Sequence, residues 1–292
     1  MALITGQVTA NDLELAHLSA GPDDGPLALC LHGFPDSAHS WRHLLPALAD
    51  AGFHAVAPFQ RGYAPTAVPA DGRYQTGALA TDACALHEAL GGGDDAVLIG
   101  HDWGAIAAYG AASLEPARWR RVVAAAVPPM AAMAGAFLSY EQLQRSWYMF
   151  FFQHPLSDLV VPMNDLEFID RLWADWSPGF DASAETPHVK DALRDPANLA
   201  AALGYYRAQW QPDLQVPELA AAQEATNASP PQPTLYLHGA DDGCIGVGVT
   251  DGLEAFLPAE GSRVEVLDGC GHFLHVERPD ELNRLVIEFV AT

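Results

Sequence analysis

Short hydrophobic runs and longer amphipathic stretches alternate along the first 130 residues of the chain. The short runs are typical of buried strands, whereas the longer stretches have apolar residues at helical spacing and end near a glycine. This alternation predicts a parallel sheet that is covered by helices. The expected strands are residues 27–31, 54–58, 96–99 and 122–127, and the expected helices are residues 41–51 and 77–91.

The pattern changes after residue 130, because residues 131–217 are helical and aromatic and contain no β-branched run long enough for a strand. Strand-like runs then return. The expected elements are strands at 233–238 and 263–267, with helices at 252–257 and 279–290. We therefore predict an α/β fold with a mostly parallel central sheet, built from core residues 1–130 and 218–292, with a helical cap inserted at residues 131–217.

The charge balance excludes several classes of partner. The chain of 292 residues carries 37 acidic and 14 basic side chains, a formal charge of −23. Such a surface repels nucleic acid and anionic lipid.

The longest uncharged stretch, residues 122–140, is interrupted by Pro128 and Pro129, which argues against a membrane span. No secretory signal is readable and the four cysteines lack disulfide or metal spacing, so we expect a cytoplasmic protein.

Candidate chemistry begins at the end of the strand expected at residues 96–99, which runs into Gly100-His101-Asp102-Trp103-Gly104 and then into a helical stretch. A strand, a G-x-nucleophile-x-G turn and a helix form a nucleophile elbow. Here the exposed side chain of the elbow is a carboxylate, Asp102. The alternative is that Asp102 only caps the helix that follows.

Three further segments follow expected strands in the order that this architecture uses. The turn at residues 32–35 suits an oxyanion hole, with the backbone N–H groups of Phe34 and Trp103 as donors. The segment 239–242 supplies a carboxylate that can orient a histidine. A glycine-rich loop near the C-terminus then supplies His272. The order nucleophile, acid, histidine is the expected one.

Four motifs resemble the epoxide hydrolases of the α/β-hydrolase superfamily, and the similarity covers essentially the whole chain. They are HGFPDS at 32–37, GHDWGA at 100–105, HGADD at 238–242 and GCGHFLHVERP at 269–279. The resemblance implies that Asp102 is the nucleophile, His272 the general base and Asp242 the acid, with Asp241 as the alternative.

The resemblance also implies two tyrosines in the cap that protonate the epoxide oxygen. Residues 148–155 read YMFFFQHP and match a Y-x-x-x-F-Q-x-P pattern, which selects Tyr148. The second tyrosine of the family stands just before an arginine, which selects Tyr206, with Tyr205 as the alternative. Either tyrosine is alternatively a half-buried aromatic of the cap. Phe59 and Gln60 stand where relatives often have an acidic residue, so no function is carried over to that loop.

The nucleophile type indicates the reaction. A carboxylate that attacks a saturated carbon forms an ester, and water can then cleave this ester. We expect conversion of a small apolar epoxide into a vicinal diol, with Phe34, Trp103, Tyr148 and Tyr206 around the substrate, and with no cofactor and no metal. A metal site on His272 and His275 is disfavoured because the sequence offers no carboxylate–histidine set to complete it.

Two other functions stay open. The same nucleophile fits a haloalkane or haloacid dehalogenase, although the Phe34 side chain offers no N–H group to a halide. A non-catalytic ligand-binding protein with this fold is the third possibility. The sequence also leaves open a homodimer.

Overall fold

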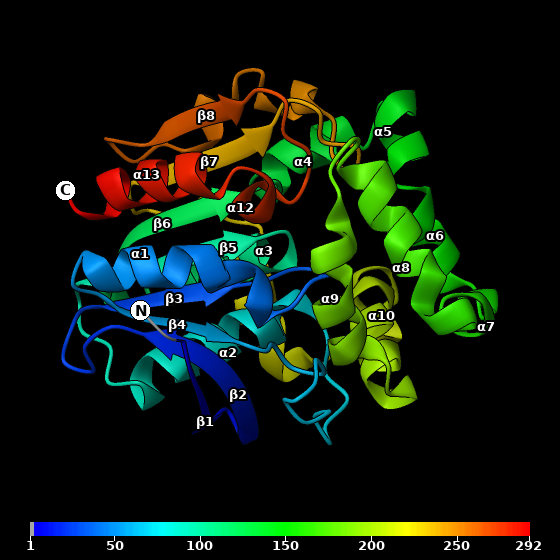
Figure 1. The fold of residues 1–292 in the computed structure, drawn as a ribbon, viewed down its shortest axis with the longest axis horizontal. Coiled ribbons are helices and arrows are strands. Elements are labelled where there is room, and N and C mark those ends of the chain that lie inside the picture. The colour runs from blue at the N-terminus through cyan, green and yellow to red at the C-terminus, as the bar shows by residue number, and fades with distance from the viewer. Residues whose placement is uncertain (1–2) are drawn as a thin grey trace.

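The computed structural model describes residues 3–292, and within this range one eight-stranded sheet runs through the molecule (Figure 1). The order of the strands across the sheet is β1-β2-β4-β3-β5-β6-β7-β8. All pairs from β4 to β8 are parallel, and the two pairs that involve β2 are antiparallel. The strands are β1 (Ile4–Ala10), β2 (Leu13–Ala20), β3 (Leu27–Leu31), β4 (His54–Pro58), β5 (Ala96–His101), β6 (Trp119–Ala125), β7 (Thr234–Gly239) and β8 (Arg263–Leu267).

Helices cover both faces of this sheet, as the sequence pattern predicts. One face carries η1 (Ala38–His43), α1 (Leu44–Asp50), α12 (Leu274–Glu277) and α13 (Pro279–Val290). The opposite face carries α2 (Thr76–Ala89), α3 (Trp103–Leu114) and α11 (Ala220–Ala225). The predicted α/β class with a mostly parallel sheet is therefore confirmed.

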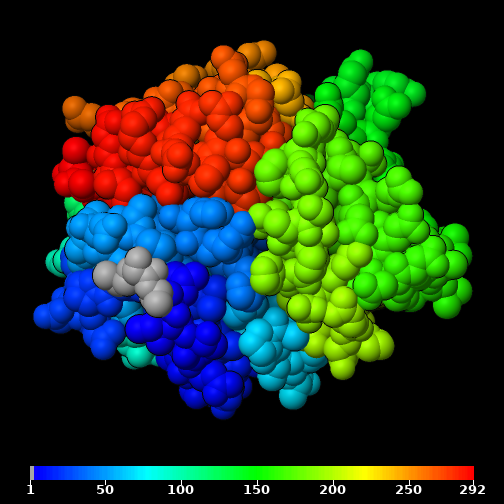
Figure 2. All heavy atoms as spheres, in the orientation of Figure 1, coloured from blue at the N-terminus to red at the C-terminus, as the bar shows by residue number. Residues whose placement is uncertain are grey.

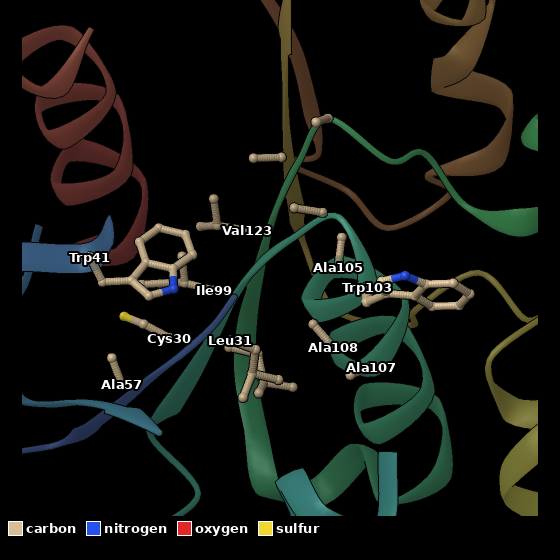
Figure 3. Packing of buried hydrophobic residues seen from close by; sticks show 14 of the residues in the cluster. Cys30, Leu31, Trp41, Ala57, Ile99, Trp103, Ala105, Ala107, Ala108 and Val123 are labelled. Carbon is tan, nitrogen blue, oxygen red and sulfur yellow. The ribbon is translucent and has the colours of Figure 1, made fainter. Parts of the chain in front are cut away.

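The core contains small and large apolar side chains, and small ones lie where α3 meets the sheet. Alanines of α3, such as Ala105 and Ala108, pack closely against the strands, while Trp41 lies on the opposite side next to Ile99 and Val123 (Figure 3). Small residues allow a helix to approach a sheet closely. This packing holds the N-terminus of α3, where Asp102 lies, firmly against the end of β5.

The sequence pattern did not predict the hairpin of β1 and β2. Its turn consists of Asn11 and Asp12, which both adopt positive φ values of 51° and 59°. Asparagine and aspartate tolerate this conformation, and two such residues in a row are typical of a tight hairpin turn. The alternating residues of β1 are partly exposed, because it is an edge strand, so its hydrophobic signal is weak.

Two predicted helices differ from the structure in type. Residues 41–51 contain the end of the 3₁₀ helix η1 and the short helix α1, and residues 252–257 form only the 3₁₀ helix η7 (Leu253–Phe256). A 3₁₀ turn suits short connections that are too brief for a stable α-helix. The predicted strand at 122–127 is confirmed as β6, although it begins and ends a few residues earlier.

Short helices from the predicted cap segment, residues 131–217, gather beyond the carboxyl ends of the strands (Figures 1 and 2). They cover this end of the sheet. That residues 131–217 form a separate cap domain stays a prediction. Within residues 3–292, no helix combines the length and the hydrophobicity that a membrane span requires. The helices and 3₁₀ turns of this part are α4 (Met130–Ala136), α5 (Tyr140–Arg145), α6 (Trp147–Gln153), α7 (Leu156–Val160), α8 (Met163–Trp176), η3 (Ala182–Ala184), α9 (Thr186–Leu193), α10 (Pro196–Trp210), η4 (Pro212–Leu214) and η5 (Pro217–Leu219).

Candidate active site

Asp102 stands at a sharp, strained turn between β5 and α3. Its backbone has φ 53° and ψ −119°, a conformation that a residue with a side chain rarely adopts. The turn brings Asp102 so close to the neighbouring loop that a Cβ at Gly33 would collide with the aspartate side chain. At Gly100, a Cβ would collide with the backbone of α3. The lack of room for a Cβ explains why glycine occupies both positions, Gly100 before the elbow and Gly33 in the loop that faces it.

The loop after β3 directs a backbone donor at the Asp102 carboxylate. The N–H of Phe34 donates to Asp102 Oδ1 at 2.8 Å. This is the donor that the sequence predicts for an oxyanion hole, and Trp103, the other predicted donor, begins α3 next to the carboxylate. A carbonyl oxygen that develops negative charge on Asp102 would therefore lie beside fixed N–H groups.

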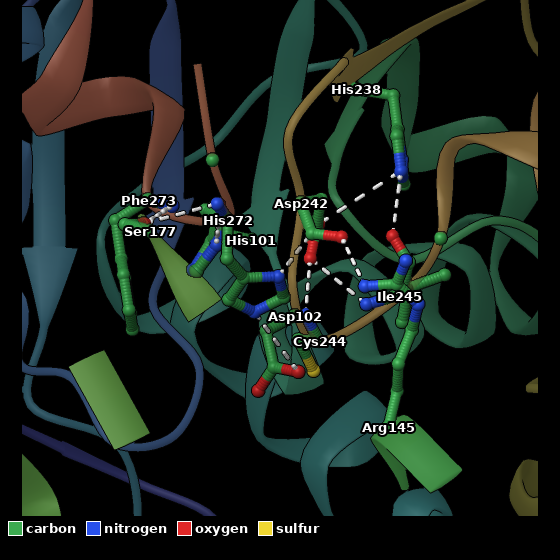
Figure 4. A network of polar contacts seen from close by, with 12 residues as sticks. His101, Asp102, Arg145, Ser177, His238, Asp242, Cys244, Ile245, His272 and Phe273 are labelled. Atoms are coloured by element: carbon green, nitrogen blue, oxygen red, sulfur yellow. Dashed lines mark hydrogen bonds and ion pairs between the residues drawn. The ribbon is translucent and has the colours of Figure 1, made fainter. Parts of the chain in front are cut away.

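His272 lies between two carboxylates (Figure 4). Its Nδ1 is 2.9 Å from Asp242 Oδ2, and its Nε2 is 3.8 Å from Asp102 Oδ2. The other oxygen of Asp242, Oδ1, accepts the N–H groups of Cys244 at 2.7 Å and Ile245 at 2.8 Å. The structure thus brings Asp102, His272 and Asp242 together at the carboxyl edge of the sheet. Asp241, the alternative acid, is exposed and has no such contact with His272 among the described residues.

Burial and charge shift the pKa values of these three groups in different directions. Burial raises the pKa of Asp102, although the charge of His272 and the N–H of Phe34 act against this. Burial alone would lower the pKa of His272, but the charge of Asp242 and its hydrogen bond outweigh this effect and raise it. The same pairing keeps the pKa of Asp242 below its ordinary value in spite of burial. Asp242 therefore stays ionised and holds the imidazole with its proton on Nδ1.

A cavity of about 480 Å³ opens between Asp102 and the helices of the cap segment. Its wall is almost entirely apolar and aromatic. Asp102 is the only carboxylate among the described residues that line it. The lining residues include Trp103, Ile106, Val127, Met130, Met133, Phe137, Met149, Phe150, Trp210 and Ile245, together with Tyr148, Tyr206 and Gln209.

Tyr148 of α6 and Tyr206 of α10 both line this cavity, with ring centroids 5.7 Å apart. The Tyr206 ring also packs against Trp103 at 4.9 Å and Phe34 at 5.2 Å. Tyr205, the alternative second tyrosine, does not line the cavity, and its hydroxyl donates instead to the carbonyl of Arg61 at 2.8 Å. Of the two neighbouring tyrosines, Tyr206 is therefore the one that faces Asp102.

A second buried group of titratable side chains lies behind Asp102 and was not found from the sequence. Asp36 Oδ2 lies 3.5 Å from His101 Nδ1 and 3.3 Å from His275 Nε2, and His101 Nε2 donates to the His272 carbonyl at 2.9 Å. A carboxylate and a second histidine therefore do lie near His275, contrary to the expectation from sequence, but His272 belongs to a different group, with Asp242 and Cys244, so His272 and His275 do not form one site. The cluster around Asp36 consists of the correct donor types for a cation, and it also anchors the backbone of His272.

The buried imidazole of His275 makes the fold sensitive to acid. Burial lowers the pKa of His275 from 6.5 to about 4. The unfolded chain therefore takes up this proton near pH 6.5, whereas the folded protein resists it until about pH 4. The stability associated with this group is complete above about pH 6.5 and decreases as the pH falls towards 4.

We predict that this single histidine accounts for about 2 kcal/mol of the free energy of unfolding that is lost between pH 7.5 and pH 5. In His275→Gln the dependence of the free energy of unfolding on pH should be weaker by that amount, because glutamine does not titrate. Urea denaturation at both pH values measures the difference. His154→Gln, at an exposed side chain, is the control. An unchanged slope in His275→Gln would contradict the prediction.

Comparisons with known proteins agree with this architecture. The family model for the alpha/beta hydrolase fold matches residues 26–279. The chain is 30% identical to Epoxide hydrolase 3 of Mus musculus, over 97% of this chain and 75% of the relative. It is 29% identical to Epoxide hydrolase A of Mycobacterium tuberculosis, over 97% of this chain and 96% of the relative. The crystal structure of Epoxide Hydrolase A from Mycobacterium thermoresistibile aligns with a TM-score of 0.81 and 27% identity, covering 99% of this chain and 98% of that one. The chain therefore belongs to the α/β-hydrolase fold family and, within it, to the epoxide hydrolases.

Proposed function

We propose that this protein converts small apolar epoxides into vicinal diols through a covalent ester on Asp102. One observation carries the proposal: a carboxylate at the nucleophile elbow and the two tyrosines, Tyr148 and Tyr206, line the same apolar cavity. A carboxylate can attack the epoxide carbon from one side while phenol groups protonate the oxygen on the other side.

In the first step an oxygen of Asp102 forms a bond to an epoxide carbon, and the carbon–oxygen bond of the ring breaks. The departing oxygen takes a proton from a tyrosine and becomes a hydroxyl group. Tyr206 is well prepared for this, because its buried hydroxyl makes no hydrogen bond of good geometry within residues 3–292, and its polar neighbour, the indole N–H of Trp103, cannot accept its proton. A buried polar group without a partner costs about 1–3 kcal/mol, so an epoxide oxygen that binds there satisfies it.

In the second step His272 removes a proton from water, and the water oxygen attacks the carbonyl carbon of the Asp102 ester. The N–H groups of Phe34 and Trp103 stabilise the charge on the carbonyl oxygen. When the intermediate collapses, the alkoxide of the product takes the proton from His272. The new carboxylic acid on Asp102 releases its proton, which restores the tyrosine. The diol keeps one oxygen of the original carboxylate.

Formation of the ester also prepares His272 for its role. The charge of Asp102 is one of the causes that raise the pKa of His272 in the free enzyme. An ester carries no charge, so this contribution disappears when Asp102 is alkylated. The pKa of His272 then decreases, and the imidazole is neutral and able to accept a proton when water must be activated.

The decisive experiment is a single turnover in heavy-oxygen water with enzyme in excess. If the reaction passes through the Asp102 ester, the first diol contains an oxygen from the protein and not from the solvent. The epoxides tested should include styrene-type and aliphatic substrates. Mass spectrometry of the diol reads out the label. A first diol that carries the solvent label would contradict the covalent route, and a complete lack of diol would contradict the function.

A dehalogenase is the second candidate, and one observation favours it. The indole N–H of Trp103 lies at the cavity beside the Tyr206 hydroxyl and makes no hydrogen bond of good geometry among the described residues, so it could face a halide. The side chain of Phe34, in contrast, provides no N–H group. A halide leaves without a proton, so only the epoxide reaction needs the two tyrosines.

We therefore predict different effects of the tyrosines on the two reactions. Tyr148→Phe or Tyr206→Phe should slow ring opening of an epoxide roughly 10²–10⁴-fold, because each removes a positioned acid. Halide release from a haloalkane or haloacid should change little. Tyr205→Phe is the matched control, since its hydroxyl contacts Arg61 instead of the cavity. Diol formation and halide release, measured on the same protein samples, separate the two functions.

A further inference from the structure

Tyr148 and Tyr206 differ in what their hydroxyl groups contact. The hydroxyl of Tyr148 lies 3.3 Å from the thiol of Cys244, whereas the polar neighbour of the Tyr206 hydroxyl is the indole N–H of Trp103, without a hydrogen bond of good geometry between them. Cys244 is only 2% exposed and lies at the start of the loop that follows the candidate acid Asp242. The two tyrosines are therefore not equivalent.

The thiol of Cys244 is held in a fixed place by its own backbone. The N–H of Cys244 donates to Asp242 Oδ1 at 2.7 Å, and its carbonyl accepts from Gln142 Nε2 of α5 at 2.9 Å. Gln142 Oε1 also accepts the N–H of Gly246 at 3.0 Å. The loop of the acid and the cap segment are thus joined at Cys244, which presents its side chain to Tyr148.

Burial also determines the chemical form of this thiol. It raises the pKa of Cys244 well above the ordinary value, so the side chain is a neutral thiol at neutral pH. A neutral thiol is both a weak donor and a weak acceptor. It can accept the O–H of Tyr148 at rest without competing strongly with an epoxide oxygen, and it can donate its S–H to a phenolate.

We propose that Cys244 is a positioning residue for Tyr148: it orients the phenol at rest and donates its S–H to the phenolate oxygen that forms as the epoxide ring opens. This inference rests on the proposed function. The Tyr148 proton moves to the epoxide oxygen, and the S–H bond of Cys244 stays intact. The thiol therefore acts only through Tyr148 and leaves the ester hydrolysis by His272 and Asp242 untouched.

The test is a double-mutant cycle on the ring-opening step. Cys244→Ala should slow single-turnover ring opening roughly two- to tenfold in the presence of Tyr148, the usual range for one hydrogen bond. In the Tyr148→Phe background the same substitution should have no effect. Cys244→Ser, which keeps a donor and an acceptor, should restore the rate, and hydrolysis of the ester should stay the same in all variants.

Two controls separate this role from a packing effect. Cys84→Ala removes another buried thiol, one that lies between α2 and α3 and does not line the cavity. It should leave ring opening unchanged, and thermal unfolding shows whether each variant is folded. A cavity at Cys244 would instead slow both steps, and would do so equally with Tyr148 or Phe at position 148.

The outcomes distinguish this inference from the proposed function. If the wild-type protein makes no diol from any epoxide, the proposed function fails. If the wild-type protein makes diol and the effect of Cys244→Ala is the same in both backgrounds, only the role of Cys244 is overturned. Slow ring opening in Cys244→Ser, as slow as in Cys244→Ala, would also overturn it.

Discussion

Asp102→Ala should produce a folded protein that has lost diol formation by at least about 10⁴-fold, because the variant has no nucleophile. No other carboxylate among the described residues lines the cavity, so no neighbour can replace Asp102. Water alone would then have to attack the epoxide, and water is a weaker nucleophile than a carboxylate held at the cavity. In the proposed mechanism Tyr148 and Tyr206 would still bind the epoxide oxygen, so the loss should appear in kcat.

The same substitution should not reduce the stability of the fold. Burial raises the pKa of Asp102, which means that the folded state disfavours its charge. Alanine keeps the backbone turn and removes only the buried charge, so the melting temperature is expected to stay unchanged or to increase. Asp241→Ala, at the exposed neighbour of Asp242, is the control and should retain activity. Diol formation by Asp102→Ala above about one hundredth of the wild-type rate would contradict the role of this residue.

The site residues that could be predicted from sequence are those in short, contiguous motifs. Asp102 lies between two glycines at the end of an unbroken apolar strand, and His272 and Asp242 follow strands in the expected order. Local backbone requirements, such as the close approach at Gly100, leave a visible pattern in the chain. The carboxyl ends of parallel strands then meet at one edge, so the pattern also predicts proximity.

Contacts between distant segments leave no such pattern. Asp36, His101 and His275 come from three parts of the chain. They meet because β3, β5 and β8 end at the same edge of the sheet, and α12, which carries His275, follows β8. The four cysteines show no disulfide or metal spacing, so nothing in the sequence marks Cys244. It is buried, but its neighbour Tyr148 comes from a cap helix whose packing no periodicity in the sequence specifies.

The edge of the fold was less predictable for a different reason. The hairpin of β1 and β2 depends on pairing with β4 and on a turn of Asn11 and Asp12, and β1 is partly exposed. A partly exposed edge strand needs few apolar residues, so the hydrophobic pattern is weak there. The Asn-Asp pair was the available signal for this turn.

His272→Gln should separate the two steps of the reaction and make the intermediate visible. In the proposed mechanism ring opening uses only Asp102 and the two tyrosines, so the variant should still react with an epoxide. Hydrolysis of the ester needs a base, and without it this step should slow by roughly 10⁴-fold or more. The variant should therefore accumulate one substrate per protein molecule, as a covalent adduct that peptide mass analysis locates at Asp102.

The adduct also decides between a catalyst and a protein that only binds its ligand. A binding protein forms no bond, and its bound ligand is lost when the protein is unfolded before mass analysis. Asp242→Asn is an informative companion, because it keeps His272 but removes the charge that holds the imidazole proton on Nδ1. It should accumulate less adduct than His272→Gln and show slow turnover. Full turnover in His272→Gln, or adduct on a residue other than Asp102, would mean that another group activates the water or attacks the substrate.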